Sequence, residues 1–161
     1  MSERENILEL KNVVYSFHTY GGEVKAVRDV SYEVRQGEIL GIVGESGCGK
    51  SVTAQCILRL NPEPPGFFEG GEILYKGQDV LKMSKKEIRK IRGREIGFVF
   101  QDPMTSLNPT MRVGAQIEEV FLGRTDVSKK EVKERAMDIM RLVGISDVEK
   151  RYKQYPHELS G

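Results

Sequence analysis

Cysteine is scarce in this sequence, because the 161 residues include only Cys48 and Cys56. Two cysteines are too few for a disulfide framework, so we expect both thiols to be reduced, as in the cytosol. Long apolar runs are also missing: the most apolar stretches, 39–43 and 96–100, are far shorter than the roughly 20 residues of a membrane-spanning helix. The polar, acidic start at 2–6 predicts no secretory signal.

An excess of one charge sign is absent as well. The chain has 25 Lys and Arg against 24 Asp and Glu, a net charge of +1. This balance does not predict a nucleic-acid surface, and the length allows about one domain with a sizeable core. Positive charge is concentrated only between Lys82 and Arg94, where Glu87 is the one acid. A solvated helix face explains this segment, and a phospholipid or partner contact is the alternative.

One stretch carries a phosphate-binding signature. Residues 44–51, here called the phosphate loop, read Gly-Glu-Ser-Gly-Cys-Gly-Lys-Ser and match the Walker A pattern G-x-x-x-x-G-K-S. The apolar run 39–43 and the helix-compatible run 52–60 predict a buried strand before the loop and a helix after it. Glycines let the backbone curl, so that consecutive N–H groups form an anion nest at the helix start. We expect Lys50 to reach the β- and γ-phosphates and the Ser51 hydroxyl to ligate Mg²⁺.

The remaining patterns predict strands first and helices later. Extended or alternating apolar residues predict strands at 7–17, 24–34, 39–43, 72–75 and 96–100. Helices are predicted by capping boxes at 84–87 and 128–131 and by composition or periodicity at 113–122 and 147–153. The helix after Ser128 carries one apolar stripe, expected to be core, of Val132, Ala136, Ile139, Met140 and Val143. The sequence thus predicts a β-rich nucleotide-binding core over 1–101 and a helical part over 102–161.

Four stretches resemble the ATP-binding cassette (ABC) ATPases of membrane transporters. They are Phe17, the phosphate loop, Phe-Val-Phe-Gln-Asp-Pro at 98–103 (a Q-loop) and Leu-Ser-Gly at 159–161 (the start of the signature Leu-Ser-Gly-Gly-Gln). The segments 101–109 and 155–161 narrow the resemblance to the dipeptide/oligopeptide (and nickel) importer branch. The resemblance covers nearly the whole chain.

The resemblance implies a fold and a set of site residues. The implied fold is α/β, an incomplete P-loop NTPase nucleotide-binding domain of the ABC type, with a β-rich antiparallel and P-loop core subdomain plus a helical signature subdomain. The implied ligands are ATP and Mg²⁺, with Gln101 and Lys50 catalytic and Ser51 and Gln101 on the metal. The implied ATP contacts are Phe17, Val24, Gly44, Glu45, Ser46, Gly47, Cys48, Gly49, Lys50, Ser51 and Val52. The implied contacts to ATP held by an opposite subunit are Leu159, Ser160 and Gly161.

One of these implied roles rests on a choice between neighbours. An aromatic ring at the position of Phe17 stacks on adenine in the family, and Tyr15, two residues earlier, is the alternative. Ala26 is a further candidate for the adenine pocket. In the family Gln101 contacts Mg²⁺ and the attacking water and couples to the membrane subunit. We expect His157 to be a surface histidine and not the switch histidine of the family.

The resemblance also implies partners and a location. In the family, two ATP-binding subunits form a homo- or heterodimer and close head to tail around two ATP molecules. The dimer binds transmembrane permease subunits, which receive solute from a solute-binding protein. The implied location of the protein is the cytoplasmic, inner face of the cell membrane. The resemblance implies no nucleic-acid partner. The family pattern continues past Gly161 with a Walker B strand ending in Asp-Glu, and no such strand follows the phosphate loop here. We therefore expect ATP binding with negligible hydrolysis, unpaired apolar strand edges and a poorly cooperative thermal transition that Mg-ATP shifts little.

Three other functions remain open at this stage. A soluble non-transport ABC ATPase, for example in DNA repair or translation, typically has long insertions between the phosphate loop and the signature, and the interval here is short. An unrelated P-loop kinase or GTPase needs a nucleobase motif such as Asn-Lys-x-Asp or an Arg-rich lid, and the sequence has neither. A regulatory product that only binds nucleotide is the third.

Overall fold

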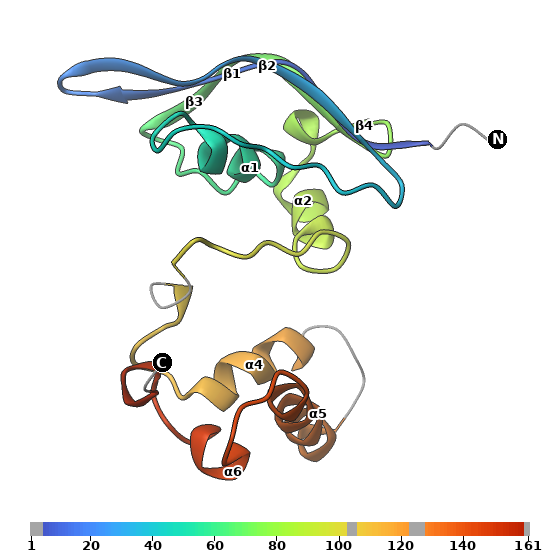
Figure 1. Cartoon of the computed structure of the whole chain (residues 1–161), viewed down its shortest axis with the longest axis vertical. Helices are drawn as coiled ribbons and strands as arrows, with labels where there is room; N and C mark the ends of the chain where they lie inside the picture. The colour runs from blue at the N-terminus through green and yellow to red at the C-terminus, as the bar shows by residue number, and fades with distance from the viewer. Residues whose placement is uncertain (1–4, 103–105, 123–127, 160–161) are drawn as a thin grey trace. The chain divides into compact units, whose positions relative to one another are not determined.

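The chain forms two compact units, Met1–Gly97 and Phe98–Gly161 (Figure 1). The computed structural model describes residues 5–102, 106–122 and 128–159. The first unit carries the β-sheet and the phosphate loop, and the second carries helices and the segment after Gln101. Each unit is described below in its own terms.

The first unit contains a four-stranded antiparallel sheet in the order β2-β1-β3-β4. Its strands are β1 (Asn6–Thr19), β2 (Gly22–Arg35), β3 (Gly66–Tyr75) and β4 (Gln78–Asp79). The strands predicted at 7–17 and 24–34 are confirmed and extend to a hairpin turn at Tyr20 and Gly21. The strand predicted at 72–75 is the end of the longer β3, because residues 66–71 also pair with β1.

Three short helices accompany the sheet: α1 (Lys50–Ile57), the 3-10 helix η1 (Val80–Lys82) and α2 (Lys85–Ile91). Figure 1 shows α1 below the curved sheet. The fully or nearly buried apolar residues of this unit are Leu10, Val13, Tyr15, Val27, Cys56, Leu58, Ile73, Tyr75, Val80, Ile88 and Ile91. Burial of each such side chain stabilises the fold by roughly 1.5–3 kcal/mol, so the inner face of the sheet and these helices form the core.

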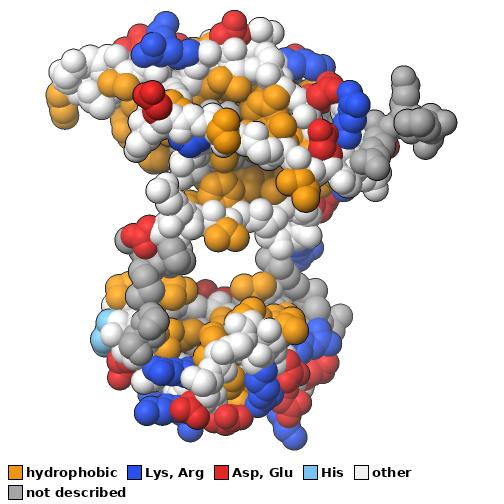
Figure 2. Space-filling view, viewed as in Figure 1, with side chains coloured by type: hydrophobic (Ala, Val, Ile, Leu, Met, Phe, Trp, Pro, Cys, Tyr) orange, Lys and Arg blue, Asp and Glu red, His pale blue; other side chains and the backbone are white. Residues whose placement is uncertain are grey.

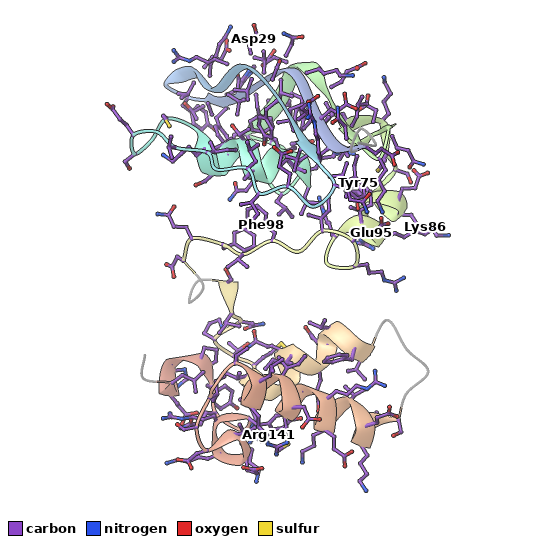
Figure 3. The ribbon with its side chains drawn as sticks, turned by 45° about the vertical axis from the view of Figure 1, so that its right-hand side comes forward. Asp29, Tyr75, Lys86, Glu95, Phe98 and Arg141 are labelled. Atoms are coloured by element: carbon purple, nitrogen blue, oxygen red, sulfur yellow. The ribbon has the colours of Figure 1, made fainter. Side chains whose placement is uncertain are left out.

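Local hydrogen bonds fix the ends of these elements. The capping box at α2 is complete, since the Glu87 N–H donates to Ser84 Oγ at 3.3 Å and the Ser84 N–H donates to Glu87 Oε2 at 2.8 Å. At the end of β3, the Tyr75 hydroxyl donates to Glu95 Oε2 at 3.2 Å, and the two side chains lie close together in Figure 3. Helix α1 ends at Ile57 rather than at the predicted Leu60, because Arg59 adopts φ +50°.

The prediction of buried strands at 39–43 and 96–100 is wrong. Ile39 and Val43 in the first unit are 97% and 94% exposed, and Val99 at the start of the second unit is 91% exposed. Figure 2 shows hydrophobic side chains at the surface of the first unit. Neither segment joins a sheet in the described part of the chain, and Ile96 forms only an isolated bridge with Arg92. An apolar run becomes a strand only where a neighbouring strand supplies hydrogen bonds. The runs 39–43 and 96–100 thus form no strand whose edge could be left unpaired, and the expectation of unpaired apolar strand edges stays a prediction.

The second unit is helical, with α4 (Val113–Leu122), α5 (Lys129–Leu142), α6 (Val148–Arg151) and the 3-10 helix η2 (Pro156–Glu158). Its core cluster is Val113, Met140 and Val148, against which Ile117, Met137, Ile145, Tyr152 and Leu159 pack. The helices predicted at 113–122, after Ser128 and near 147–153 are confirmed. None of the helices among the described residues is long and apolar enough to span a membrane.

Two finer predictions for this unit are wrong in part. In the predicted stripe, Ile139 and Val143 are 42% and 66% exposed, and Val143 is the C-cap residue after α5, which packs against α4 and α6. Val132, Ala136 and Met140, the rest of the stripe, are buried as expected. The cap at Ser128 is only half of a capping box: its Oγ accepts from the Glu131 N–H at 3.3 Å. The Glu131 carboxylate instead accepts from Arg135 at 2.8 Å, one turn further along the helix.

Candidate nucleotide-binding site

The phosphate loop leads directly into α1, and its glycines determine its course. Gly47 and Gly49 have φ of +80° and +94°, the left-handed region that favours glycine, and Gly49 is the N-cap of α1. A Cβ on Gly49 would overlap with the carbonyl oxygen of Ala26 in β2. A Cβ on Gly44 would lie 2.8 Å from Cys48 Sγ. The loop backbone is thus packed closely both against β2 and against itself.

The Lys50 ammonium lies within the phosphate loop. Its Nζ donates to the carbonyl oxygens of Gly44 at 2.8 Å and Glu45 at 2.6 Å, and to Cys48 Sγ at 3.6 Å. An ammonium has three N–H donors and no acceptor, so it can donate to carbonyl oxygens and to phosphate oxygens alike. The arrangement places a positive charge beside the N-terminus of α1, where the helix dipole also favours an anion.

The first turn of α1 presents the other predicted phosphate and metal contacts. The Ser51 side chain is exposed and Val52 is half-buried. Thr53 is buried, and both its N–H and its hydroxyl donate to the Gly49 carbonyl, at 2.8 and 3.0 Å. A hydroxyl next to bound phosphate oxygens matches the oxygen-only ligands that Mg²⁺ prefers. Ser51 therefore fits the predicted metal role by donor chemistry.

The predicted adenine contacts lie on β1 and β2, beside the strand segment that touches the loop. Phe17 is half-buried and pairs across the strands with Val24. Ala26, two residues after Val24, is the residue that the Gly49 backbone approaches. Tyr15 is fully buried, its hydroxyl donates to the Pro62 carbonyl at 3.4 Å, and burial raises its pKa to about 12. Because Tyr15 is a core residue, Phe17 is the one of the pair that a ligand can reach.

The two cysteines have different environments. Cys48 is exposed in the phosphate loop, whereas Cys56 is fully buried in α1. Burial raises the pKa of the Cys56 thiol to about 12, although the Asn61 side chain, which donates to its sulfur at 3.2 Å, acts in the opposite direction. The same Asn61 amide donates to the Val52 carbonyl at 3.1 Å. Asn61 was not among the site residues expected from the sequence, although it supports α1 directly after the phosphate loop.

The remaining predicted site residues belong to the second unit. Gln101 is exposed, and Leu159 is half-buried against the core of Val113, Met140 and Val148. Ser160 and Gly161 lie outside the described residues. The structure therefore places Phe17, Val24 and the phosphate loop in one unit, and the roles of all the predicted site residues stay predictions.

Comparison with curated proteins gives close relatives. The chain is 56% identical over 155 residues to the oligopeptide transport ATP-binding protein OppD of Bacillus subtilis (strain 168), which covers 96% of this chain and 43% of that protein. It is 49% identical over 157 residues to the dipeptide transport ATP-binding protein DppD of the same strain, covering 98% of this chain and 47% of that protein. The chain thus spans less than half the length of these relatives.

Solved structures and a family model agree with these matches. The dimeric structure of MJ0796, a bacterial ABC transporter cassette, matches with a TM-score of 0.80 and 26% identity, over 96% of this chain and 63% of that chain. The same cassette in a dimeric post-hydrolysis state bound to ADP and Pi also gives a TM-score of 0.80, over 95% of this chain and 63% of that chain, at 26% identity. The fold class is therefore confirmed as ABC-type, incomplete relative to that cassette. The ABC transporter family model matches residues 27–161, and the chain belongs to this family.

Proposed function

We propose that this chain supplies the Mg-ATP-binding part of an ATP-binding subunit in an ABC importer for peptides. The observation that carries the proposal is the Lys50 ammonium, held 2.6–2.8 Å from loop carbonyl oxygens at the start of α1. The names of the relatives, oligopeptide and dipeptide transport ATP-binding proteins, support peptides as the solute class and favour transport over a soluble non-transport ATPase.

Different residues of the first unit contact different parts of the nucleotide. The backbone N–H groups of the phosphate loop and the N-terminus of α1 bind phosphate oxygens. Lys50 exchanges the carbonyl oxygens of Gly44 and Glu45 for the β- and γ-phosphates. The Ser51 hydroxyl holds Mg²⁺, which neutralises phosphate charge when it is bound. Phe17 and Val24, paired across β1 and β2, hold the adenine ring.

The second unit and the partners complete the proposal. We assign 1–101 to the nucleotide-binding core and 102–161 to the helical signature subdomain. Gln101 contacts Mg²⁺ and the attacking water and couples to a permease subunit. Leu159, Ser160 and Gly161 contact ATP held by a second ATP-binding subunit, and the dimeric arrangement of MJ0796 supports such a pair. The assembly acts at the cytoplasmic face of the membrane, with a solute-binding protein as an indirect partner.

A segment exchange tests the transport role. A chimera is made in which the matching 155 residues of OppD are replaced by those of this chain. It is produced in a Bacillus subtilis strain that lacks OppD. The proposal expects the chimera to restore uptake of labelled oligopeptides, and expects the same chimera with Lys50→Ala to fail. A chimera that is produced at normal levels and binds Mg-ATP, yet leaves peptide uptake at the level of the deletion strain, contradicts the peptide assignment.

Removal of the Phe17 ring is expected to weaken ATP binding. Stacking of an aromatic ring on a base contributes about 1–3 kcal/mol, so Phe17→Ala should raise the Kd for Mg-ATP by roughly tenfold, and Phe17→Tyr should leave it nearly unchanged. The matched control is Tyr20→Ala, an exposed aromatic in the adjoining hairpin turn. Isothermal titration with Mg-ATP measures both, and equal affinities for Phe17→Ala and Tyr20→Ala would remove Phe17 from the site.

Thiol labelling reports on the phosphate loop directly. At pH 8 a maleimide should modify exposed Cys48 and leave Cys56 unmodified, because Cys56 is buried and its thiol, with a pKa of about 12, remains protonated. Saturating Mg-ATP should slow the labelling of Cys48. Mass spectrometry of the digested protein separates the two sites. A Cys48 labelling rate that Mg-ATP leaves unchanged would argue against a nucleotide in this loop.

A further inference from the structure

Three potential metal ligands meet on three neighbouring strands of the first unit. They are His18 on β1, Glu23 on β2 and Glu69 on β3, and one ligand atom from each lies within 4.8 Å of the others. His18 and Glu23 are directly opposite each other in the β1–β2 register. His18 Nε2 lies 2.8 Å from Glu69 Oε1. Successive residues of a strand face opposite sides, so His18 lies on the other face of the sheet from Phe17.

Each of the three side chains is positioned by a neighbour. Val14 pairs with Gly70 and Tyr15 with Phe68, so Glu69 is an extra, unpaired residue at a bulge, a feature that commonly redirects a side chain. The His18 ring packs on the Phe67 ring, with centroids 5.0 Å apart.

Glu23 has a buried support. Its Oε1 accepts from the hydroxyl of Ser16 at 2.9 Å, and Ser16 is fully buried. Such outer contacts orient metal ligands and usually raise metal affinity. The cluster is therefore held together by the sheet before any ion is present.

We propose that His18, Glu23 and Glu69 form a site for a divalent transition-metal ion of the Zn²⁺ type. Imidazole nitrogen and carboxylate oxygen are ordinary Zn²⁺ ligands at about 2.0–2.2 Å, whereas Mg²⁺ prefers oxygen ligands alone. A tetrahedral ion at such distances needs ligand atoms about 3.4 Å apart, within the 4.8 Å limit of this cluster. The two carboxylates balance the charge of the ion, and water takes the fourth position.

Lys25 competes with the ion for one ligand. Its Nζ lies 3.8 Å from Glu23 Oε1, and both side chains are about half exposed. The ion must displace this ammonium, so Lys25→Ala should strengthen metal binding, by about two- to fivefold for an exposed ion pair. A purely structural role for the cluster does not predict a gain on removal of Lys25.

A Zn²⁺ titration tests the site. The whole chain is used without nucleotide and in a Cys48→Ser background, because the exposed thiol of Cys48 also binds Zn²⁺. Isothermal titration should detect one site that His18→Ala and the isosteric Glu69→Gln weaken at least about tenfold. The chain contains two histidines, so His157→Ala is the matched control and should leave the affinity unchanged. In ¹H–¹⁵N spectra of the imidazoles, Zn²⁺ should shift the His18 ring and not the His157 ring.

Several results would overturn the proposal. They are no Zn²⁺ binding by the Cys48→Ser protein, equal binding by that protein and by Glu69→Gln, or a shift of the His157 ring in place of the His18 ring. Thermal melting supplies a second measurement, since an ion bound only to the folded sheet must raise Tm. That increase in Tm should disappear in Glu69→Gln, and its persistence would also count against the site.

Discussion

Replacement of Lys50 by alanine is expected to weaken Mg-ATP binding by about a hundredfold. The ammonium lies among the carbonyl oxygens of the phosphate loop, and charge-assisted hydrogen bonds to phosphate are the strong ones. Loss of such a partner in a binding site costs about 2–5 kcal/mol, and about 2.7 kcal/mol corresponds to a hundredfold change in Kd. Isothermal titration or a fluorescent ATP analogue measures the change.

A second lysine separates this effect from general electrostatics. Lys11 lies on β1, where its Nζ forms an exposed pair with Glu9 at 3.2 Å. Lys11→Ala removes the same formal charge from the same unit, yet its ATP affinity should stay within about 0.5 kcal/mol of the parent value. If both alanine variants bind ATP equally well, Lys50 does not contact the nucleotide.

Gly49→Ala is expected to destabilise the first unit strongly. At φ +94° any other residue has a cost of about 1–2 kcal/mol, and here the added methyl also overlaps with the backbone carbonyl of Ala26. A backbone oxygen of a strand moves aside less easily than the end of a flexible side chain. The combined loss of unfolding free energy should reach at least about 3 kcal/mol. Urea denaturation followed by circular dichroism measures it.

Gly47→Ala is the matched control for that experiment. Gly47 has a similar φ of +80°, but an added Cβ there meets nothing within 4 Å. This variant should therefore show only the conformational cost of about 1–2 kcal/mol. The difference between the two variants isolates the contact between the loop and β2. Equal destabilisation by both substitutions would mean that the contact with Ala26 is not tight in solution.

Local signals in the sequence predicted much of what forms. The capping box at Ser84 and the alternation along β2 depend on residues that are neighbours in the chain, and both are confirmed. Gly47 and Gly49 of the phosphate loop also adopt conformations that only glycine tolerates easily.

Predictions that depended on distant residues were less successful. An apolar run such as 39–43 indicates burial, but pairing depends on which strands lie beside it, and the sequence of the run does not contain that information. The exposed positions of the α5 stripe, Ile139 and Val143, have the same cause, since periodicity does not say how many sides of a helix are covered. The cluster of His18 and Glu69 was missed because it depends on strand register and a bulge.

The hydrogen bonds of Lys50 have a consequence for the speed of nucleotide exchange. The Lys50 ammonium is paired with the carbonyl oxygens of Gly44 and Glu45, so a phosphate that binds Lys50 replaces two acceptors. The binding free energy is then a difference between two well-paired states, which limits affinity. When the nucleotide departs, the ammonium returns to acceptors a short distance away and is never left unpaired, so dissociation should be rapid.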